Sequence, residues 1–150
     1  MEIKDGYYKW NKNEKGNLSP HFGMKEFACQ CKNEDCLEQS LSLSLINKLE
    51  LLRTIVNKPI RVNSGYRCHK HQLALAAGGK ETAVGISTHE LGHAADISCP
   101  ELIIQDLTPF VDKFFDSYGV AWNFIHCDLR PKRANGSKRI WYYSSAPGKF

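Results

Sequence analysis

Apolar residues recur with a helical period in the first half of the chain. Steps of four, four, three and four residues separate Leu41, Leu45, Leu49, Leu52 and Val56. This spacing places all five on one face of a helix, and Pro59 follows where a helix commonly ends. The pattern predicts a helix over residues 40–57 whose apolar stripe packs in the core instead of binding a partner.

Strand patterns lie downstream of this helix. Residues 60–63 alternate apolar and polar side chains, and residues 94–97 are small or extended enough for a buried strand. In a strand predicted over residues 122–129, Phe124, His126 and Asp128 share one face. A last strand over residues 139–143 follows a loop with the hairpin signal Asn135-Gly136, so a terminal hairpin is predicted.

Two further helices are predicted between these strands. Residues 68–77 form the first, which ends at a Gly-Gly pair suited to a left-handed terminus, and residues 80–88 then form a loop. The second helix is predicted to begin at Pro100 and to end at Tyr118-Gly119. Thr108-Pro109 resembles a cap followed by a first-turn proline, so the helix is expected to restart there. Helices before and between strands indicate an α+β domain with a small, mostly antiparallel sheet flanked by helices.

The N-terminal region is polar and has few apolar anchors. Residues 1–18 are predicted to form an irregular N-terminal arm, and residues 18–27 a short helical turn packed through Phe22 and Phe27. A length of 150 residues with 42% apolar and 24% charged residues suits one globular domain over residues 1–150.

The net charge of +4 is mild. Its basic residues gather mainly at Arg130, Lys132, Arg133, Lys138 and Arg139. We interpret this cluster as a solvated face, with a screened attraction to an anionic partner as the alternative. Because no aromatic residues are interleaved with it, no nucleic-acid partner is expected. No apolar run is long enough for a signal peptide or a membrane span, so a monomer made in the cytoplasm, without membrane insertion, is expected.

Three residues have the right chemistry for a hydrolytic zinc site: His89, Asp96 and His126. Such a site needs three protein ligands and an open position, where the metal lowers the pKa of water to about 7. Asp96 lies in an otherwise apolar strand, where an unpaired carboxylate would be costly to bury. A lone histidine is more often a surface or core residue, so the residues alone leave both interpretations open.

Several motifs follow one another in a set order. They are Ser64-Gly65-Tyr66-Arg67, Gly78-Gly79, Ser87-x-His89-x-x-Gly92-x-Ala94-x-Asp96-Ile97 and Trp122-Asn123-Phe124-Ile125-His126-x-Asp128. Together they resemble the zinc D-Ala-D-Ala carboxypeptidase family of peptidoglycan metallopeptidases, which is related to the vancomycin-resistance dipeptidases and the Hedgehog signalling domain. The resemblance covers roughly residues 18–130 and implies the fold of that family.

The resemblance also implies roles for individual residues. His89, Asp96 and His126 would bind one catalytic zinc ion. Arg67 would hold the substrate or stabilise the tetrahedral oxyanion, for which a fixed guanidinium is well suited, and Ser87 would hydrogen-bond the peptide beside the metal. The structural alternatives are a surface salt bridge for Arg67 and a turn residue for Ser87.

The general base departs from the family pattern. Relatives carry a carboxylate three residues before the last zinc histidine, but this chain has Asn123 there, and an amide cannot take a proton from water. Asp128 lies about 6.6 Å along the strand from His126, where it could act as the base or orient a ligand. We predict that Asp128 is the base, with Glu90 as a fallback on a solvated loop.

The other histidines are given lesser roles. His93 lies four residues after His89, but the intervening glycine and the following strand argue against a helical metal pair, so His93 is expected beside the pocket. His69 and His71 are expected on a helix surface.

Six cysteines without a secretion signal favour thiols or metal ligands over disulfides. Cys29, Cys31 and Cys36 form a Cys-x-Cys-x4-Cys motif, which is not a standard zinc-finger spacing. A fourth ligand is missing nearby, although folding could bring in Cys68 or His69. Free thiols are therefore favoured over a second zinc ion at Cys29, Cys31 and Cys36.

The favoured function is a zinc metallopeptidase that hydrolyses an amide bond in peptidoglycan stem peptides, of the D-Ala-D-Ala carboxypeptidase or endolysin type. Such an enzyme would act at the cell wall if a lysis partner released it; a cytosolic dipeptidase is also compatible. The alternative is a catalytically inactive, zinc-stabilised module that binds cell wall or a protein. Asn123 favours that module, whereas Arg67 and Ser87 favour the enzyme.

Overall fold

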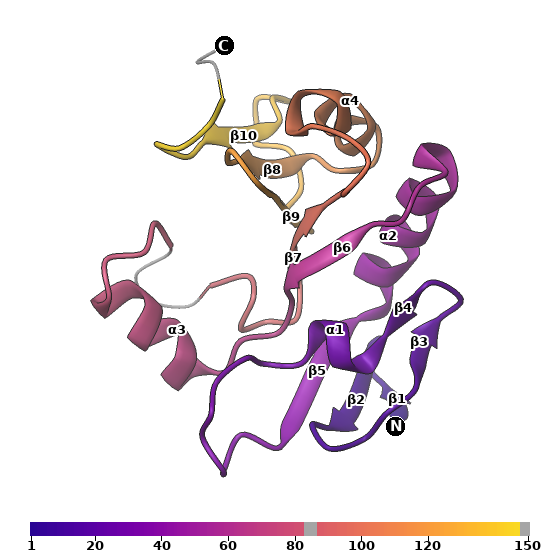
Figure 1. Ribbon diagram of the computed structural model, residues 1–150, viewed down its shortest axis with the longest axis vertical. Helices are drawn as coiled ribbons and strands as arrows, with labels where there is room; N and C mark the ends of the chain where they lie inside the picture. The colour runs from indigo at the N-terminus through magenta and orange to yellow at the C-terminus, as the bar shows by residue number, and fades with distance from the viewer. Residues whose placement is uncertain (83–86, 148–150) are drawn as a thin grey trace.

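The computed structural model describes residues 1–82 and 87–147 (Figure 1). Residues 83–86 of the predicted 80–88 loop lie outside this part. The strands are β1 (Glu2–Lys4), β2 (Tyr7–Asn11), β3 (Asn17–Ser19), β4 (Phe22–Gly23), β5 (Glu38–Ser42), β6 (Arg61–Ser64), β7 (Ala94–Ser98), β8 (Ser117–Val120), β9 (Ile125–Asp128) and β10 (Arg139–Tyr142). The helices are α1 (Met24–Phe27), α2 (Leu43–Val56), α3 (His69–Ala77) and α4 (Ile104–Phe114).

The prediction of an irregular arm over residues 1–18 is wrong. β1 and β2 form an antiparallel hairpin across Asp5-Gly6, whose φ angles of 52° and 83° suit a two-residue hairpin turn. β2 also pairs with β5, which makes a three-stranded antiparallel sheet at one end of the molecule (Figure 1). Tyr8 and Trp10 are buried at alternate positions of β2, a strand pattern that the polar residues around them conceal.

The first long helix begins later than predicted. Residues 38–42 pair with β2 as β5, so α2 starts at Leu43, and its N-cap Ser42 accepts a hydrogen bond from the Ser44 amide. Leu41 therefore reaches the core from a strand, and the remaining members of the apolar stripe do so from the helix. Phe22 and Phe27 are buried as predicted, although Phe22 belongs to the β3–β4 hairpin and only Phe27 to a helical turn.

A five-stranded sheet with the order β10-β8-β9-β7-β6 holds the middle of the fold. β7 pairs antiparallel with β6 on one side and with β9 on the other, and Asp96 lies opposite His126 in this register. α2 and α4 pack against each other, while α3 stands on the far side of β6 and β7 from α2 (Figure 1). The centre of the sheet thus presents polar residues of β7 and β9 on the side toward α3.

The C-terminal third corrects two predictions. α4 is one helix that begins at Ile104, with Pro109 inside it and no restart, and residues 117–120 form β8 instead of the helix end. The terminal hairpin is also wrong, because β9 is already paired with β7 and β8 and has no free edge. β10 instead pairs parallel with β8, where Trp141 lies over Gly119; a Cβ on that glycine would come within 2.3 Å of the indole.

The predicted fold class is confirmed: the chain is α+β, and its described strand pairs are antiparallel except for β8 with β10. The predicted helix at 68–77 and strand at 94–97 occur as α3 and β7. Within residues 1–82 and 87–147, no helix combines the length and apolar character needed to cross a membrane.

Candidate metal centre

Three elements bring the predicted metal ligands together. Asp96 lies in β7 directly opposite His126 of β9, because the two strands pair in antiparallel register. His89 reaches the same place from the turn that precedes β7. That turn closes with amide-to-carbonyl bonds from Gly92 to His89 and from His93 to Thr88. Gly92 has a φ of 72°, and a Cβ there would lie 2.6 Å from the Ser40 carbonyl oxygen, so glycine is needed for the turn.

The three ligand atoms form a nearly equilateral triangle. His89 Nε2 lies 3.2 Å from Asp96 Oδ1 and 3.2 Å from His126 Nδ1, and the last two atoms are 3.0 Å apart. A tetrahedral zinc ion with ligands at about 2.0–2.1 Å has edges of about 3.3 Å between them. All three residues are buried, so this donor set fits a metal ion with one side open.

Hydrogen bonds fix which nitrogen of each imidazole faces the metal position. His89 Nδ1 lies 2.7 Å from the Gly65 carbonyl oxygen and must donate to it, which leaves the Nε2 lone pair free. His126 Nε2 lies 2.9 Å from Asp128 Oδ2, which leaves its Nδ1 free. Such partners orient metal-binding histidines and set their tautomers.

Burial and mutual charge set the protonation of the ligands. Burial lowers the pKa of His89 even though Asp96 acts to raise it, so this imidazole is neutral at pH 7. Burial acts to raise the pKa of Asp96, but His89 and His126 hold it well below its ordinary value. The pKa of His126 is raised because hydrogen bonds to Asp128 and Asp96 outweigh its burial. His89 and Asp96 are therefore in the forms that bind metals, a neutral imidazole and an ionised carboxylate, whereas metal binding would displace a proton from His126.

Arg67 is a buried residue of this centre and not a surface salt bridge. Its Nη2 donates to Asp96 Oδ2 at 3.1 Å, on the carboxylate oxygen that does not face the histidines. Ser64 Oγ, Gln72 Oε1 and Thr82 Oγ1 accept further hydrogen bonds from its guanidinium, at 3.1, 3.1 and 3.3 Å. Four partners therefore hold the guanidinium beside the metal position in one orientation.

Ser87 is also buried, and its hydroxyl accepts a hydrogen bond from the His89 amide at 3.1 Å. This contact is that of a turn residue that fixes His89. Ser87 also lines the cavity beside the metal position. The two roles considered from the sequence, fixing the turn and binding the peptide, are therefore compatible.

The contacts of Asp128 favour the second of its two predicted roles. The carboxylate lies behind His126, on the nitrogen opposite the metal-facing Nδ1. Its oxygens also accept hydrogen bonds from the amide, Nε and Nη2 of Arg130 at 2.9–3.1 Å. Burial acts to raise the pKa of Asp128, but His126 and Arg130 keep it well below its ordinary value. An ionised carboxylate in this place orients a metal ligand.

A cavity of about 790 Å³ borders the three ligands. Its wall includes aromatic and titratable side chains that the sequence did not single out for the site: His71, Glu81, Phe124, Trp141 and Tyr143. Trp141 packs on His126 with ring centroids 5.3 Å apart. It reaches this place through the parallel pairing of β10 with β8, which local sequence patterns did not predict.

Other polar residues of the motifs lie elsewhere. Asn123 is exposed in the turn before β9 and is not among the residues described as lining the cavity. Glu90 is not a solvated loop residue, because its side chain is only 11% exposed and its Oε2 lies 3.1 Å from His69 Nδ1. His93 stacks on Tyr7 of β2 and contacts its hydroxyl.

Comparison with known proteins agrees with this geometry. The profile of the family described as Peptidase M15 matches residues 20–128, which include the three ligands, Arg67 and Asp128. No curated protein and no solved structure matches the chain. The predicted resemblance to D-Ala-D-Ala carboxypeptidases is thereby confirmed at the level of the family. With its His-Asp-His cluster beside a cavity, the chain belongs to the peptidase M15 family.

Proposed function

We propose that the protein is a zinc peptidase that hydrolyses an amide bond in peptidoglycan stem peptides at the cell wall. The observation that carries this proposal is the triangle of His89, Asp96 and His126 ligand atoms, 3.0–3.2 Å apart, on the wall of a cavity of about 790 Å³. Three protein ligands beside open space are typical of a catalytic zinc, whereas a structural zinc is usually enclosed by four.

When bound, zinc supplies a Lewis acid that acidifies water and polarises a carbonyl group. Arg67 complements it as the fixed cation that binds the carbonyl oxygen and its developing negative charge. Its hydrogen bonds to Ser64, Gln72, Thr82 and Asp96 can use both Nη1 hydrogens, the Nε hydrogen and one Nη2 hydrogen. A second Nη2 hydrogen can then bind the substrate, in a pocket where such a preorganised donor is worth far more than in water.

We assign Asp128 to positioning His126 and not to accepting the proton from water. Proton transfer then falls to a side chain of the cavity wall, for which His71 of α3 has suitable chemistry. Burial lowers the pKa of His71, and the charges of Arg67 and Lys12 act in the same direction, so at pH 7 the imidazole is neutral and has a lone pair that can accept a proton.

The cavity suits a short peptide that carries a carboxylate. Phe124, Trp141 and Tyr143 offer apolar faces, and Arg67 and Arg130 offer positive charge. Arg130 also lies over the Trp141 ring, 5.3 Å from its centroid. A carboxypeptidase needs such a cation for the C-terminal carboxylate of the stem, whereas an endolysin that cuts within the stem does not. The placement of two arginines therefore supports the carboxypeptidase type.

The test is digestion of purified peptidoglycan with the zinc-loaded protein, followed by mass spectrometry of the released fragments. A loss of one alanine from stem pentapeptides is expected, with no release by His89→Ala. The matched control is His21→Ala, which removes a histidine outside the cavity lining. Cleavage inside the stem would establish the endolysin type. No cleavage by protein that holds zinc would overturn the enzyme in favour of the binding module.

A further inference from the structure

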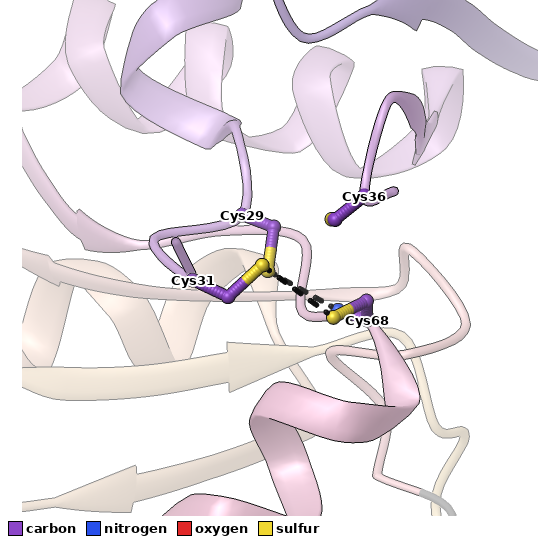
Figure 2. A group of neighbouring side chains, drawn as sticks. All are labelled: Cys29, Cys31, Cys36 and Cys68. Carbon is purple, nitrogen blue, oxygen red and sulfur yellow. Dashed lines mark hydrogen bonds between the residues drawn. The ribbon is translucent and has the colours of Figure 1, made fainter. Parts of the chain in front are cut away.

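Four cysteines from two distant parts of the chain converge on one point (Figure 2). Cys29, Cys31 and Cys36 come from the loop after α1, and Cys68 is the N-cap residue of α3. Their four sulfur atoms all lie within 4.8 Å of one another. Folding thus supplies the fourth sulfur that the Cys-x-Cys-x4-Cys motif lacks.

We propose that Cys29, Cys31, Cys36 and Cys68 bind a second, structural zinc ion. In a tetrahedral site with Zn–S bonds of about 2.3 Å, the sulfurs lie about 3.8 Å apart. The sulfurs of Cys31 and Cys68 are 3.7 Å apart. A disulfide needs about 2.0 Å, and all six cysteines of the chain are free. The arrangement therefore has the dimensions of a metal site and not of a pair of disulfides.

Polar groups around the sulfurs suit thiolate ligands. The Cys68 amide donates to Cys29 Sγ at 3.3 Å, Lys12 Nζ to Cys31 Sγ at 3.6 Å, and Gln39 Nε2 to Cys36 Sγ at 3.6 Å. Four thiolates around Zn²⁺ carry a net charge of −2, which the ammonium of Lys12 partly offsets. Outer donors of this kind orient metal ligands and stabilise their charge.

The loop that carries three of the cysteines is held by single hydrogen bonds, such as those from the Cys29 amide to Gln39 Oε1 at 2.6 Å and from Lys12 Nζ to the Cys31 carbonyl oxygen at 2.8 Å, and not by the ladder of a sheet or helix. Residues 28–37 contain no helix or strand, and Leu37 is exposed. The Lys70–Asp35 ion pair that joins the loop to α3 is exposed on both sides, so it contributes little. A metal that binds the loop and α3 together would add a stronger link between them.

The cysteine cluster is separate from the first centre but is joined to it by residues 65–68. Gly65 accepts the hydrogen bond from His89, Arg67 donates to Asp96, and Cys68 belongs to the cluster. The Tyr66 amide also donates to the Phe27 carbonyl oxygen at 2.8 Å, two residues before Cys29. A zinc ion at the cluster would therefore fix one end of the segment that places Arg67 and orients His89.

The test is the zinc content of protein purified under reducing conditions, measured by mass spectrometry. Two equivalents are expected for the unmodified chain and one for Cys36→Ala. Cys99→Ala, which removes a buried cysteine outside the cluster, should keep two. A total of one equivalent that Cys36→Ala retains and His89→Ala loses would overturn the proposal, as would a disulfide among the four cysteines.

Cobalt replacement gives a second measurement that does not depend on the folding of Cys36→Ala. Cobalt-loaded His89→Ala should still show the intense near-ultraviolet absorption of thiolate-to-cobalt charge transfer, because the cysteine site remains. Absence of this absorption from both His89→Ala and the unmodified chain would overturn the cysteine site. The metal count is independent of peptidoglycan cleavage, so failure of the proposed peptidase function would leave this result unaffected.

Discussion

The two clusters of metal-binding side chains differ in ligand number and in surroundings. The first has three ligands of mixed type, His89, Asp96 and His126, and a cavity beside it. The second has four sulfurs, and the described residues that line the cavity do not include them. Three ligands leave a metal able to take up a further molecule, whereas four sulfurs saturate it.

The clusters also differ in what holds them. Regular strands position Asp96 and His126, because their register across β7 and β9 is set by the core face of the sheet. An irregular loop carries Cys29, Cys31 and Cys36. The first centre is therefore preformed by the fold, while in the second the metal would form part of the fold. Metal removal should therefore have opposite effects on activity and stability at the two places.

Stepwise metal removal gives the largest expected effect on this comparison. A chelator such as 1,10-phenanthroline should remove one zinc equivalent and all peptidase activity, with a smaller fall in Tm than loss of the cysteine-bound ion causes, because only the binding free energy is lost and the strands keep the ligands in place. A mercurial thiol reagent should then release the second equivalent and lower Tm. Metal release, activity and calorimetric Tm are measured on the same samples. Loss of the first equivalent without loss of activity would contradict the assignment.

Arg67→Lys tests the fixed cation of the first centre. We expect kcat/KM to fall by about 10²–10³-fold, because a lysine ammonium cannot reproduce the forked contacts of the guanidinium. Zinc content should be unchanged. Arg61→Lys on strand β6, which precedes the segment that carries Arg67, is the matched control, since Arg61 is exposed, and it should behave like the unmodified protein. Loss of zinc from Arg67→Lys would mean that Arg67 acts mainly by supporting Asp96.

Asp128→Asn separates a positioning carboxylate from a general base. We expect both metal affinity and kcat/KM to fall by about 10–100-fold, because the amide binds His126 and Arg130 less strongly. A general base would instead lose turnover and leave zinc binding intact. Competition with a fluorescent chelator and steady-state kinetics distinguish the two. Asp112→Asn, whose carboxylate pairs with Lys138, should change neither quantity.

Glu50→Gln should have the smallest effect, a change in stability alone, and should alter neither metal-binding cluster. Partial burial acts to raise the pKa of Glu50, but hydrogen bonds from Ser19 and His21 lower it below its ordinary value of 4.5. This lowered pKa stabilises the fold above pH 4.5, and the stabilisation is lost as the pH falls through the folded-state value. The variant should lose about 1 kcal/mol of unfolding free energy at pH 7.

The difference between Glu50→Gln and the unmodified protein should shrink at pH 3, which denaturant titrations at the two pH values would reveal. An equal difference at both pH values would mean that the carboxylate charge does not contribute. Peptidase activity should be unchanged at pH 7, in contrast to every variant of the first centre.

Local patterns in the sequence predicted much of the fold. The leucine stripe gave the core of α2, and the apolar run around Asp96 gave β7, because periodicity reports which face of an element is buried. The N-terminal hairpin was missed although Asp5-Gly6 is a hairpin signal, because only two buried anchors, Tyr8 and Trp10, mark its strand. β8 was missed because the four residues 117–120 looked like the end of a helix.

Motif order and a carboxylate in an apolar strand are local properties, so the amino-acid sequence was enough to predict the peptidase family, the α+β class and the cluster of His89, Asp96 and His126. The place of Asp128 behind His126 and of Trp141 on the cavity wall follows from the three-dimensional fold and not from local patterns. The fold alone brought Cys68 to the other three cysteines. The places of Trp141 and Cys68 depend on strand order and on contacts between distant residues, such as the contact of Cys31 with Cys68 across 37 residues, whose loop-closure entropy and competing partners no local pattern encodes.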